Sequence, residues 1–134
     1  EFNEANAEIA RKIIDHAGLS DQIHVIVGTL GDGGGTLSHL ESICELAAGG
    51  LDFVFIDHAK DAYLSDLRLI LEKGWLHPGS IVVADNIKVP GAPDYHAYMK
   101  NQEGKLWHSK EHKSFAEYQL VIPDMVLESD YLGD

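Results

Sequence analysis

Two short apolar runs that each end in an acidic residue constrain this chain most. Residues 51–57 read Leu-Asp-Phe-Val-Phe-Ile-Asp, and residues 81–86 read Ile-Val-Val-Ala-Asp-Asn. Runs of this length suit strands that are buried on both faces, as in parallel sheets covered by helices. Because the carboxyl ends of parallel strands meet at one edge of a sheet, we expect Asp57, Asp85 and Asn86 to lie together there. Three oxygen ligands in one place predict a site for a hard cation.

The rest of the chain alternates helical and strand patterns, which predicts an α/β fold with a doubly wound, mostly parallel sheet. Helices are expected over 3–17, from Thr36 or Ser38 to about 48, over 61–73, and over 94–101 with Asp94 as cap. Strands are expected over 23–27, 51–57, 80–85, 106–110 and 125–129. The loop between the last two strands leaves no room for a crossover helix, so we expect an antiparallel hairpin at the far end of the sheet.

Composition excludes several classes of partner. The 134 residues suit one domain with a single core. Twenty-two acidic residues against ten basic ones give a net charge of −12, which argues against nucleic-acid binding and against anionic membranes. Cys44 is the only cysteine, which rules out a disulfide within the chain. The chain begins on Glu1 and not on Met, so we expect a piece of a longer protein whose upstream segments are not seen here.

Three strings carry a resemblance to a known family. Residues 57–64 (Asp-His-Ala-Lys-Asp-Ala-Tyr-Leu), 85–94 (Asp-Asn-Ile-Lys-Val-Pro-Gly-Ala-Pro-Asp) and 114–118 (Ser-Phe-Ala-Glu-Tyr) resemble the catechol O-methyltransferases in order and nearly in spacing. The resemblance implies a Rossmann-like class I methyltransferase domain over 1–134, incomplete at its N-terminus because the family's glycine-rich loop would precede Glu1. It implies magnesium-dependent transfer of a methyl group from S-adenosylmethionine to one hydroxyl of a small-molecule catechol, and we expect a cytoplasmic protein.

The resemblance also implies roles for individual residues. The metal ligands would be Asp57, Asp85 and Asn86. The catalytic residues would be the general base Lys60 and two residues that hold the catechol hydroxyls, Asn86 and Glu117. The cofactor contacts would come from Glu1 at the ribose, His58 at the adenine, and Phe2, Leu30 and Asp57.

The chemistry of the residues agrees with these roles. Magnesium prefers octahedral oxygen coordination and keeps several waters, so two carboxylates and an amide leave room for two catechol oxygens. A phenol-like hydroxyl has a pKa of about 10 and is a poor nucleophile at neutral pH. A nearby dication lowers that pKa, and an amine can take the proton. A lysine beside a metal ion is expected to have a lowered pKa, which would make Lys60 usable as a base.

Other interpretations remain open. Strand-end aspartates commonly cap turns, and a lone Lys60 or Glu117 would ordinarily be a surface residue. A related metal-dependent O-methyltransferase could act on another vicinal diol or on a phenylpropanoid thioester, and Ala59 stands where the family commonly has a tryptophan. A non-catalytic homologue could keep the fold as a binding module. A nicotinamide-dependent dehydrogenase would share an acidic ribose contact, but it explains neither the three oxygen ligands nor Lys60.

Overall fold

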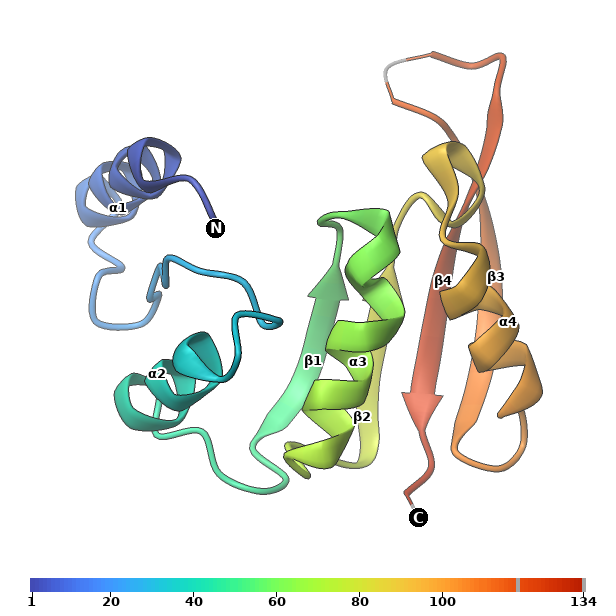
Figure 1. Ribbon diagram of the computed structural model, residues 1–134. Coiled ribbons are helices and arrows are strands. Elements are labelled where there is room, and N and C mark those ends of the chain that lie inside the picture. Colours follow the sequence, from blue (N-terminus) through green and yellow to red (C-terminus); the bar gives the residue numbers. More distant parts are fainter. Residues whose placement is uncertain (118, 134) are drawn as a thin grey trace. The chain divides into compact units, whose positions relative to one another are not determined.

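The computed structural model describes residues 1–117 and 119–133. Tyr118, the last residue of the third family string, therefore lies outside the described residues. The chain divides into two compact units, Glu1–Leu46 and Ala47–Asp134, each with its own arrangement of elements (Figure 1). In the described part of the chain, no helix is long and apolar enough to cross a membrane.

Two helices make up the regular structure of Glu1–Leu46. The first is α1 (Glu4–His16), which begins where the Asn3 side chain accepts a hydrogen bond from the backbone N–H of Asn6. This confirms the helix predicted over 3–17. The second, α2 (Gly35–Ile43), is shorter than predicted. The chain leaves the helix at this point, and Glu45 adopts a positive φ of 49°, which a helix cannot continue through.

The strand predicted over 23–27 is wrong, because no described residue of that segment pairs in a sheet. Its backbone bonds go elsewhere: the terminal ammonium of Glu1 donates to the Ile26 carbonyl at 3.2 Å, and the Gly28 N–H donates to the Glu1 carbonyl at 3.0 Å. The Arg11 guanidinium also donates to the Val25 carbonyl, at 2.9 Å. A β-branched run favours a strand only where a neighbouring strand supplies the hydrogen-bond ladder.

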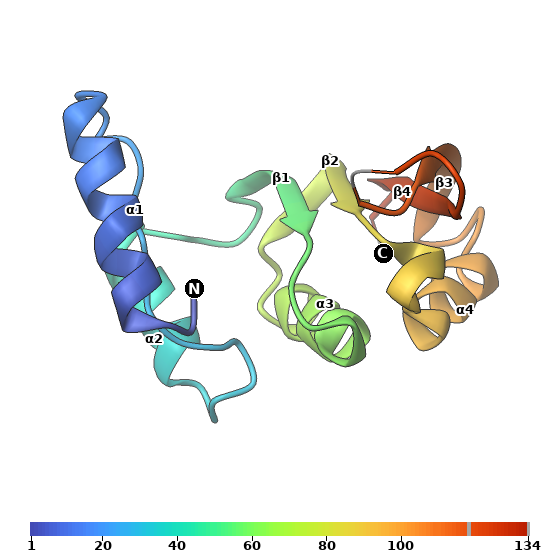
Figure 2. The ribbon, with the colours of Figure 1, turned by 90° about the horizontal axis from the view of Figure 1, so that it is seen from above.

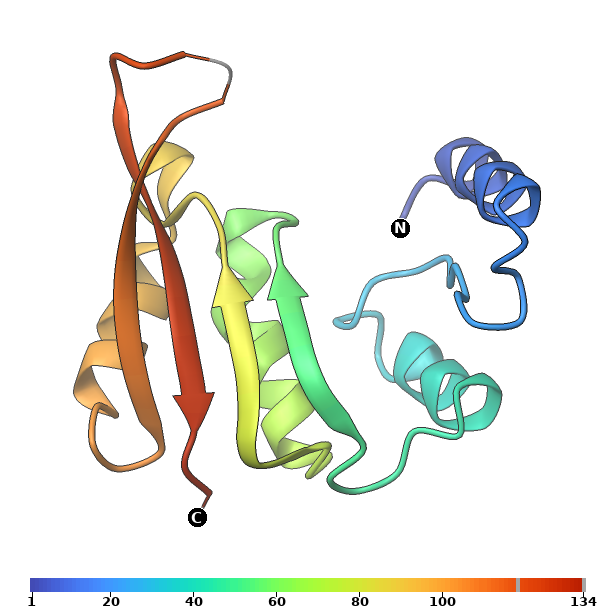
Figure 3. The ribbon, with the colours of Figure 1, turned by 180° about the vertical axis from the view of Figure 1, so that it is seen from behind.

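The second unit, Ala47–Asp134, is built on a four-stranded sheet in the order β1-β2-β4-β3 (Figure 3). Its strands are β1 (Leu51–Ile56), β2 (Leu76–Ala84), β3 (Trp107–Phe115) and β4 (Pro123–Tyr131). Strands β1 and β2 run parallel, whereas β4 is antiparallel to both β2 and β3. The predicted α/β fold and its antiparallel terminal hairpin are therefore confirmed, and β2, β3 and β4 are longer than expected.

Both helices of this unit cover the same face of its sheet (Figures 2 and 3). A single 3₁₀ turn, η1 (Lys60–Ala62), leads into α3 (Tyr63–Glu72), and a short π-helical turn, η2 (Ile87–Gly91), leads into α4 (Pro93–Asn101). The fully buried side chains between the helices and the sheet include Tyr63, Leu67, Val82, Tyr95, Met99 and Trp107. This core fixes the positions of the strand ends on which the predicted site depends.

Two local predictions for this unit were wrong. Phe53 and Phe55 are 56% and 57% exposed, because both helices cover the opposite face of the sheet. Strand β1 is therefore buried on that opposite face only. Asp94 does not cap α4, since Pro93 is its first residue and Ala92 precedes it without a side-chain cap. Proline suits the first helical position because its missing N–H would have no partner there.

Candidate active site

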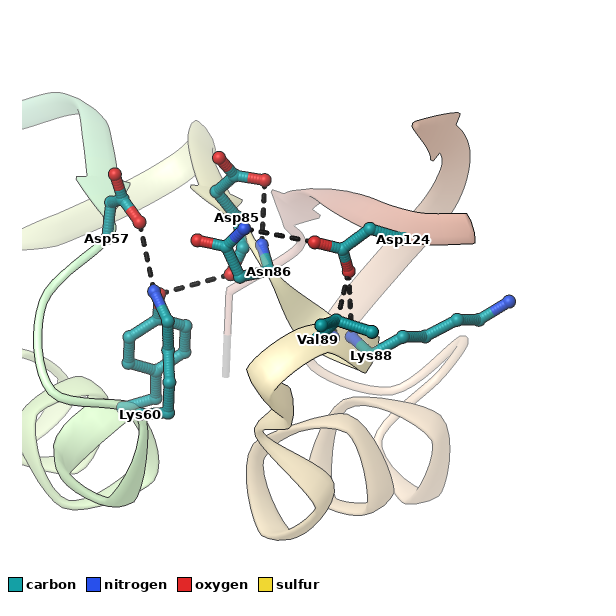
Figure 4. Close-up of polar contacts among 8 residues, drawn as sticks. Asp57, Lys60, Asp85, Asn86, Lys88, Val89 and Asp124 are labelled. Atoms are coloured by element: carbon teal, nitrogen blue, oxygen red, sulfur yellow. Dashed lines mark hydrogen bonds and ion pairs between the residues drawn. The ribbon is translucent and has the colours of Figure 1, made fainter. Parts of the chain in front are cut away.

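The acidic residues that follow β1 and β2 lie at the same edge of the sheet. Ile56 pairs with Ala84 in the parallel register, so Asp57 and Asp85 leave the sheet at the same level. The backbone N–H of Asp85 donates to the Ile56 carbonyl at 3.1 Å, which continues the ladder one residue past β2. Figure 4 shows the side chains of Asp57, Asp85 and Asn86 at this edge.

Lys60 joins the two strand ends. Its Nζ donates to Asp57 Oδ1 at 2.9 Å and contacts the Tyr63 hydroxyl at 2.6 Å. The Tyr63 hydroxyl in turn donates to the backbone carbonyl of Asp85 at 3.1 Å. The Lys60 side chain is only 17% exposed and its Nζ lies 4.9 Å from the centre of the Tyr63 ring. The amine is thus fixed beside the acidic edge by the turn η1 and the first residue of α3.

The surroundings of Lys60 shift its pKa in both directions. Burial lowers the pKa of Lys60, but the hydrogen bonds to Tyr63 and Asp57 raise it, and the net pKa lies above its ordinary value. Burial raises the pKa of the Tyr63 hydroxyl, whereas its hydrogen bond with Lys60 lowers that pKa. With Asp57 as its partner, Lys60 is therefore an ammonium group near neutral pH.

Asn86 is held by an acidic residue that sequence reasoning missed. Asn86 adopts left-handed backbone angles (φ 53°, ψ 41°), which asparagine tolerates better than most residues. Its Nδ2 donates to Asp124 Oδ2 at 3.0 Å, and its backbone N–H donates to Asp85 Oδ1 at 2.7 Å. Burial raises the pKa of Asp124, and the hydrogen bonds from Asn86 and the backbone amides lower it, with a net lowering. The signal in the sequence was weak: one acidic residue before the apolar run Met-Val-Leu at 125–127.

His58 also has an acidic partner that the sequence pattern did not predict. Its Nε2 lies 2.8 Å from Oδ2 of Asp66, a residue of α3 that is only 7% exposed. The His58 ring also lies 5.2 Å from the Tyr63 ring, measured between centroids. The Asp66 carboxylate of α3 therefore orients the imidazole, and 44% of the His58 side chain remains exposed to solvent.

The predicted set also includes Glu117 and three residues of the other unit. Glu117 is exposed and follows β3, and the β3–β4 connection lies at the same end of the sheet as the ends of β1 and β2 (Figure 1). No hydrogen bond or ion pair joins its carboxylate to another described residue. Glu1, Phe2 and Leu30 belong to Glu1–Leu46, where Glu1 Oε1 accepts from the Asn3 N–H at 2.9 Å and Phe2 is 79% exposed.

The donor atoms at the strand ends suit a hard cation. Within residues 1–117 and 119–133, no three His, Cys, Asp or Glu side chains are grouped closely enough to hold a metal ion. The predicted set instead combines the carboxylates of Asp57 and Asp85 with one amide. Because Nδ2 of Asn86 faces Asp124, the Oδ1 of that amide is left for another partner. Oxygen atoms alone fit Mg²⁺, which completes its shell with water or substrate oxygens.

Comparisons with known proteins place the chain in a family. A family profile described as a methyltransferase domain matches residues 1–87. A probable O-methyltransferase of Mycobacterium tuberculosis is 59% identical over 133 residues, covering 99% of this chain and 57% of that protein. The catechol O-methyltransferase of Sus scrofa is 41% identical over 100 residues (75% of this chain, 51% of that protein), and that of Mus musculus is 34% identical over 122 residues (91% and 43%).

The fold also matches solved structures. The crystal structure of the Podospora anserina methyltransferase PaMTH1 with SAH bound superimposes with a TM-score of 0.63 at 17% identity, covering 99% of this chain and 59% of that chain. At this identity the likeness concerns the fold alone. The chain spans about half the length of the curated relatives it matches. From the family profile, which matches residues 1–87, the chain belongs to the methyltransferase domain family.

Proposed function

We propose that the protein transfers a methyl group from S-adenosylmethionine to one hydroxyl of a catechol, with Mg²⁺ at the ends of β1 and β2. The observation that carries the proposal is the gathering of Asp57, Asp85 and Asn86 at one sheet edge, with the Lys60 Nζ 2.9 Å from Asp57. The catechol O-methyltransferases among the relatives, at 34% and 41% identity, support the substrate class. The SAH-bound structural neighbour supports the cofactor.

In this proposal each side chain at the strand ends has one task. Asp57, Asp85 and Asn86 Oδ1 supply the protein oxygens of the cation site. When bound, Mg²⁺ would hold both catechol oxygens and lower the pKa of the hydroxyl that is methylated. With Lys60 as the neutral amine, the hydroxyl proton passes to its Nζ, the oxygen bonds to the methyl carbon, and the carbon–sulfur electron pair returns to sulfur, which becomes a thioether.

The Asp57 carboxylate belongs both to the cation site and to the surroundings of the proposed base, Lys60. An ammonium ion paired with a free carboxylate is a poor base, and Lys60 is such an ion in the described geometry. A carboxylate that shares its charge with a cation stabilises a neighbouring ammonium less, which lowers the pKa of Lys60 toward that of a useful base. The Tyr63 hydroxyl keeps Nζ in position throughout.

The remaining predicted residues complete the proposal. Glu117 holds a catechol hydroxyl from the β3–β4 connection. Glu1 binds the ribose hydroxyls of the cofactor, Leu30 and His58 border its adenine, and Phe2 also contacts the cofactor. The Asp66 carboxylate orients His58 for this contact.

A second candidate is a related metal-dependent O-methyltransferase with another substrate, such as a different vicinal diol or a phenylpropanoid thioester. The relative with 59% identity is described only as a probable O-methyltransferase, without a catechol. Ala59 is also smaller than the tryptophan that the resemblance leads one to expect there. A non-catalytic homologue is disfavoured because Asp57, Lys60 and Asn86 keep both the residue types and the geometry that catalysis needs.

Methyl transfer from radiolabelled S-adenosylmethionine tests the proposal in the full-length protein. Catechol, phenol with its single hydroxyl, and a phenylpropanoid thioester are compared, each with Mg²⁺ and with EDTA. We expect labelling of catechol that EDTA abolishes and no labelling of phenol. Lys60→Ala should lower kcat by about 10²- to 10⁴-fold, whereas the matched control Lys110→Ala, exposed on β3, should leave it unchanged. Equal labelling of phenol without Mg²⁺ would refute the proposal.

A further inference from the structure

One buried carboxylate at the start of β4 binds four N–H groups. Asp124 is 2% exposed, and its Oδ2 accepts from Asn86 Nδ2 at 3.0 Å. Its Oδ1 accepts from the backbone N–H groups of Lys88 and Val89, each at 3.1 Å (Figure 4). The same oxygen accepts from the backbone N–H of Met125 at 2.7 Å. A single side chain thus joins β4 to the turn that follows β2.

These contacts select one orientation of the Asn86 amide. The nitrogen and the oxygen of an amide differ in what they bind, because only the nitrogen donates and only the oxygen accepts or ligates a cation. A carboxylate opposite the amide accepts hydrogen bonds, so it takes Nδ2 and leaves Oδ1 on the other side. In Figure 4 that oxygen lies on the side of Asn86 that faces Asp57.

The backbone contacts strengthen this effect. Asn86 is in the left-handed region, and two of the N–H groups that bind the Asp124 carboxylate belong to Lys88 and Val89, two and three residues after it. The same carboxylate therefore fixes both the amide of Asn86 and the path of the chain that leaves it.

We propose that Asp124 is a positioning residue that turns the Asn86 amide so that its oxygen, and not its nitrogen, is presented to a hard divalent cation. The inference rests on the proposed function, because it assigns the cation site to Asp57, Asp85 and Asn86. It adds a requirement that the ligands themselves do not reveal: the charge opposite Asn86 determines whether Asn86 can serve as a ligand.

The variant Asp124→Asn separates this role from a purely structural one. Its amide oxygen can still accept from the three backbone N–H groups, but its NH₂ now faces Asn86. To avoid two opposed donors, the Asn86 amide turns its oxygen to position 124 and its nitrogen to the cation. An amide nitrogen does not ligate a hard cation, so we expect affinity to fall by about 10- to 100-fold, as for other residues that orient metal ligands.

The double variant Asn86→Asp with Asp124→Asn should restore binding. The new carboxylate at position 86 can accept from the NH₂ at position 124 with one oxygen and offer the other to the cation. Recovery by a second substitution is not expected if Asp124 only supports the fold. Asp130→Asn, which removes the same charge elsewhere on β4, is the matched control and should leave the affinity unchanged.

The probe is Mn²⁺, which takes the same oxygen ligands as Mg²⁺ and whose free form is measured by electron paramagnetic resonance in titrations of the full-length protein. Thermal melting without metal reports folding of each variant. Weak binding by Asp124→Asn and recovery in the double variant would support the proposal. Native-like affinity of Asp124→Asn, or loss of folding in both variants, would show that Asp124 serves the fold alone and leave the proposed function standing. Absence of Mn²⁺ binding by the native protein would overturn both.

Discussion

The two units of the chain differ in how firmly they hold the residues assigned to the site. In Ala47–Asp134, residues that follow β1 and β2 form a hydrogen-bonded cluster with residues of η1, α3 and β4, next to a core of buried aromatic residues. In the described residues of Glu1–Leu46, the buried side chains are only Ala7, Thr36 and Leu37. The proposed metal ligands therefore rest on a packed sheet, whereas Glu1, Phe2 and Leu30 rest on segments with little core.

The helix α1 forms as its sequence pattern predicts, but its apolar residues are not buried. Its apolar residues recur at helical spacing, and the helix forms as predicted, yet Ile9 and Ile13 are 57% and 65% exposed. In α3 the same kind of spacing buries Leu67 and Ile70 against the sheet. A periodic pattern determines which side of a helix is apolar, but burial, and with it most of the stability, depends on the element that packs there.

Truncating a core aromatic residue should give the largest contrast between the units. Trp107 is fully buried, and it packs against Tyr131 with ring centroids 5.1 Å apart. Trp107→Ala should lower the free energy of unfolding by about 3–5 kcal/mol, because it removes a large buried ring and leaves a cavity. The control Phe2→Ala removes an exposed ring and should alter the free energy of unfolding by no more than about 0.5 kcal/mol. Urea denaturation measures both, and equal effects would contradict the contrast.

Two neighbouring tyrosines sharpen the comparison within the second unit. Tyr63 and Tyr95 are both buried with ring centroids 5.7 Å apart, but only the Tyr63 hydroxyl is bonded, to Lys60 and Asp85. The Tyr95 hydroxyl has no hydrogen-bond partner among the described residues. Tyr63→Phe should lower the free energy of unfolding by about 1–3 kcal/mol, because it leaves buried partners unsatisfied.

Tyr95→Phe is the matched change, and it should be neutral or stabilising, since it removes a buried hydroxyl without a bonded partner. Chemical denaturation of both variants gives the two values. A larger loss for Tyr95→Phe than for Tyr63→Phe would show that the hydrogen bonds around Lys60 do not stabilise this edge.

Helix capping in Glu1–Leu46 should give a smaller, local effect. The Asp32 carboxylate accepts from the Thr36 backbone N–H at 2.9 Å and from the Thr36 hydroxyl at 2.7 Å, which ties down the start of α2. Asp32→Ala should lower the local stability of α2, because the start of the helix loses both hydrogen bonds at Thr36. Hydrogen exchange should rise in α2 and stay unchanged in α3. Faster exchange in both helices would mean that the two units unfold together.

The smallest expected effect is a pH dependence at the start of β2. The backbone carbonyl of Pro78 and the carboxylate of Asp52, which lie 2.9 Å and 3.0 Å from its ring nitrogens, raise the pKa of His77. A raised pKa in the folded state adds stability that is fully present below the unfolded pKa of about 6.5 and is lost as the pH rises through the folded pKa. Thermal melts of His77→Gln should therefore converge with those of the native protein at alkaline pH. A difference that grows with pH would contradict this.

The sequence predicted the strand-end residues well because their positions depend on local pattern. An apolar run that ends in Asp57 or in Asp85-Asn86 places those residues at a known edge as soon as the strands are parallel. Asp124 could not be found in this way. It lies 38 residues from Asn86, and the contact depends on how β4 pairs with β2, a register that periodicity does not determine.

The errors in the sequence predictions have the same physical origin. Residues 23–27 have the composition of a strand but no neighbouring strand to complete their ladder. Phe53 and Phe55 belong to an apolar run, but the helices of their unit cover the opposite face. In both cases the local residues specify a preference, and the partner elements decide the outcome.

We propose that Asp57, Asp85 and Asn86 bind one divalent cation at the ends of β1 and β2. A crystal structure of the full-length protein soaked in Mn²⁺, with anomalous scattering measured at the manganese edge, would show this site directly. We expect one strong anomalous peak within bonding distance of an oxygen from each of the three side chains. A peak elsewhere, or no peak at this edge with the three side chains ordered, would contradict it.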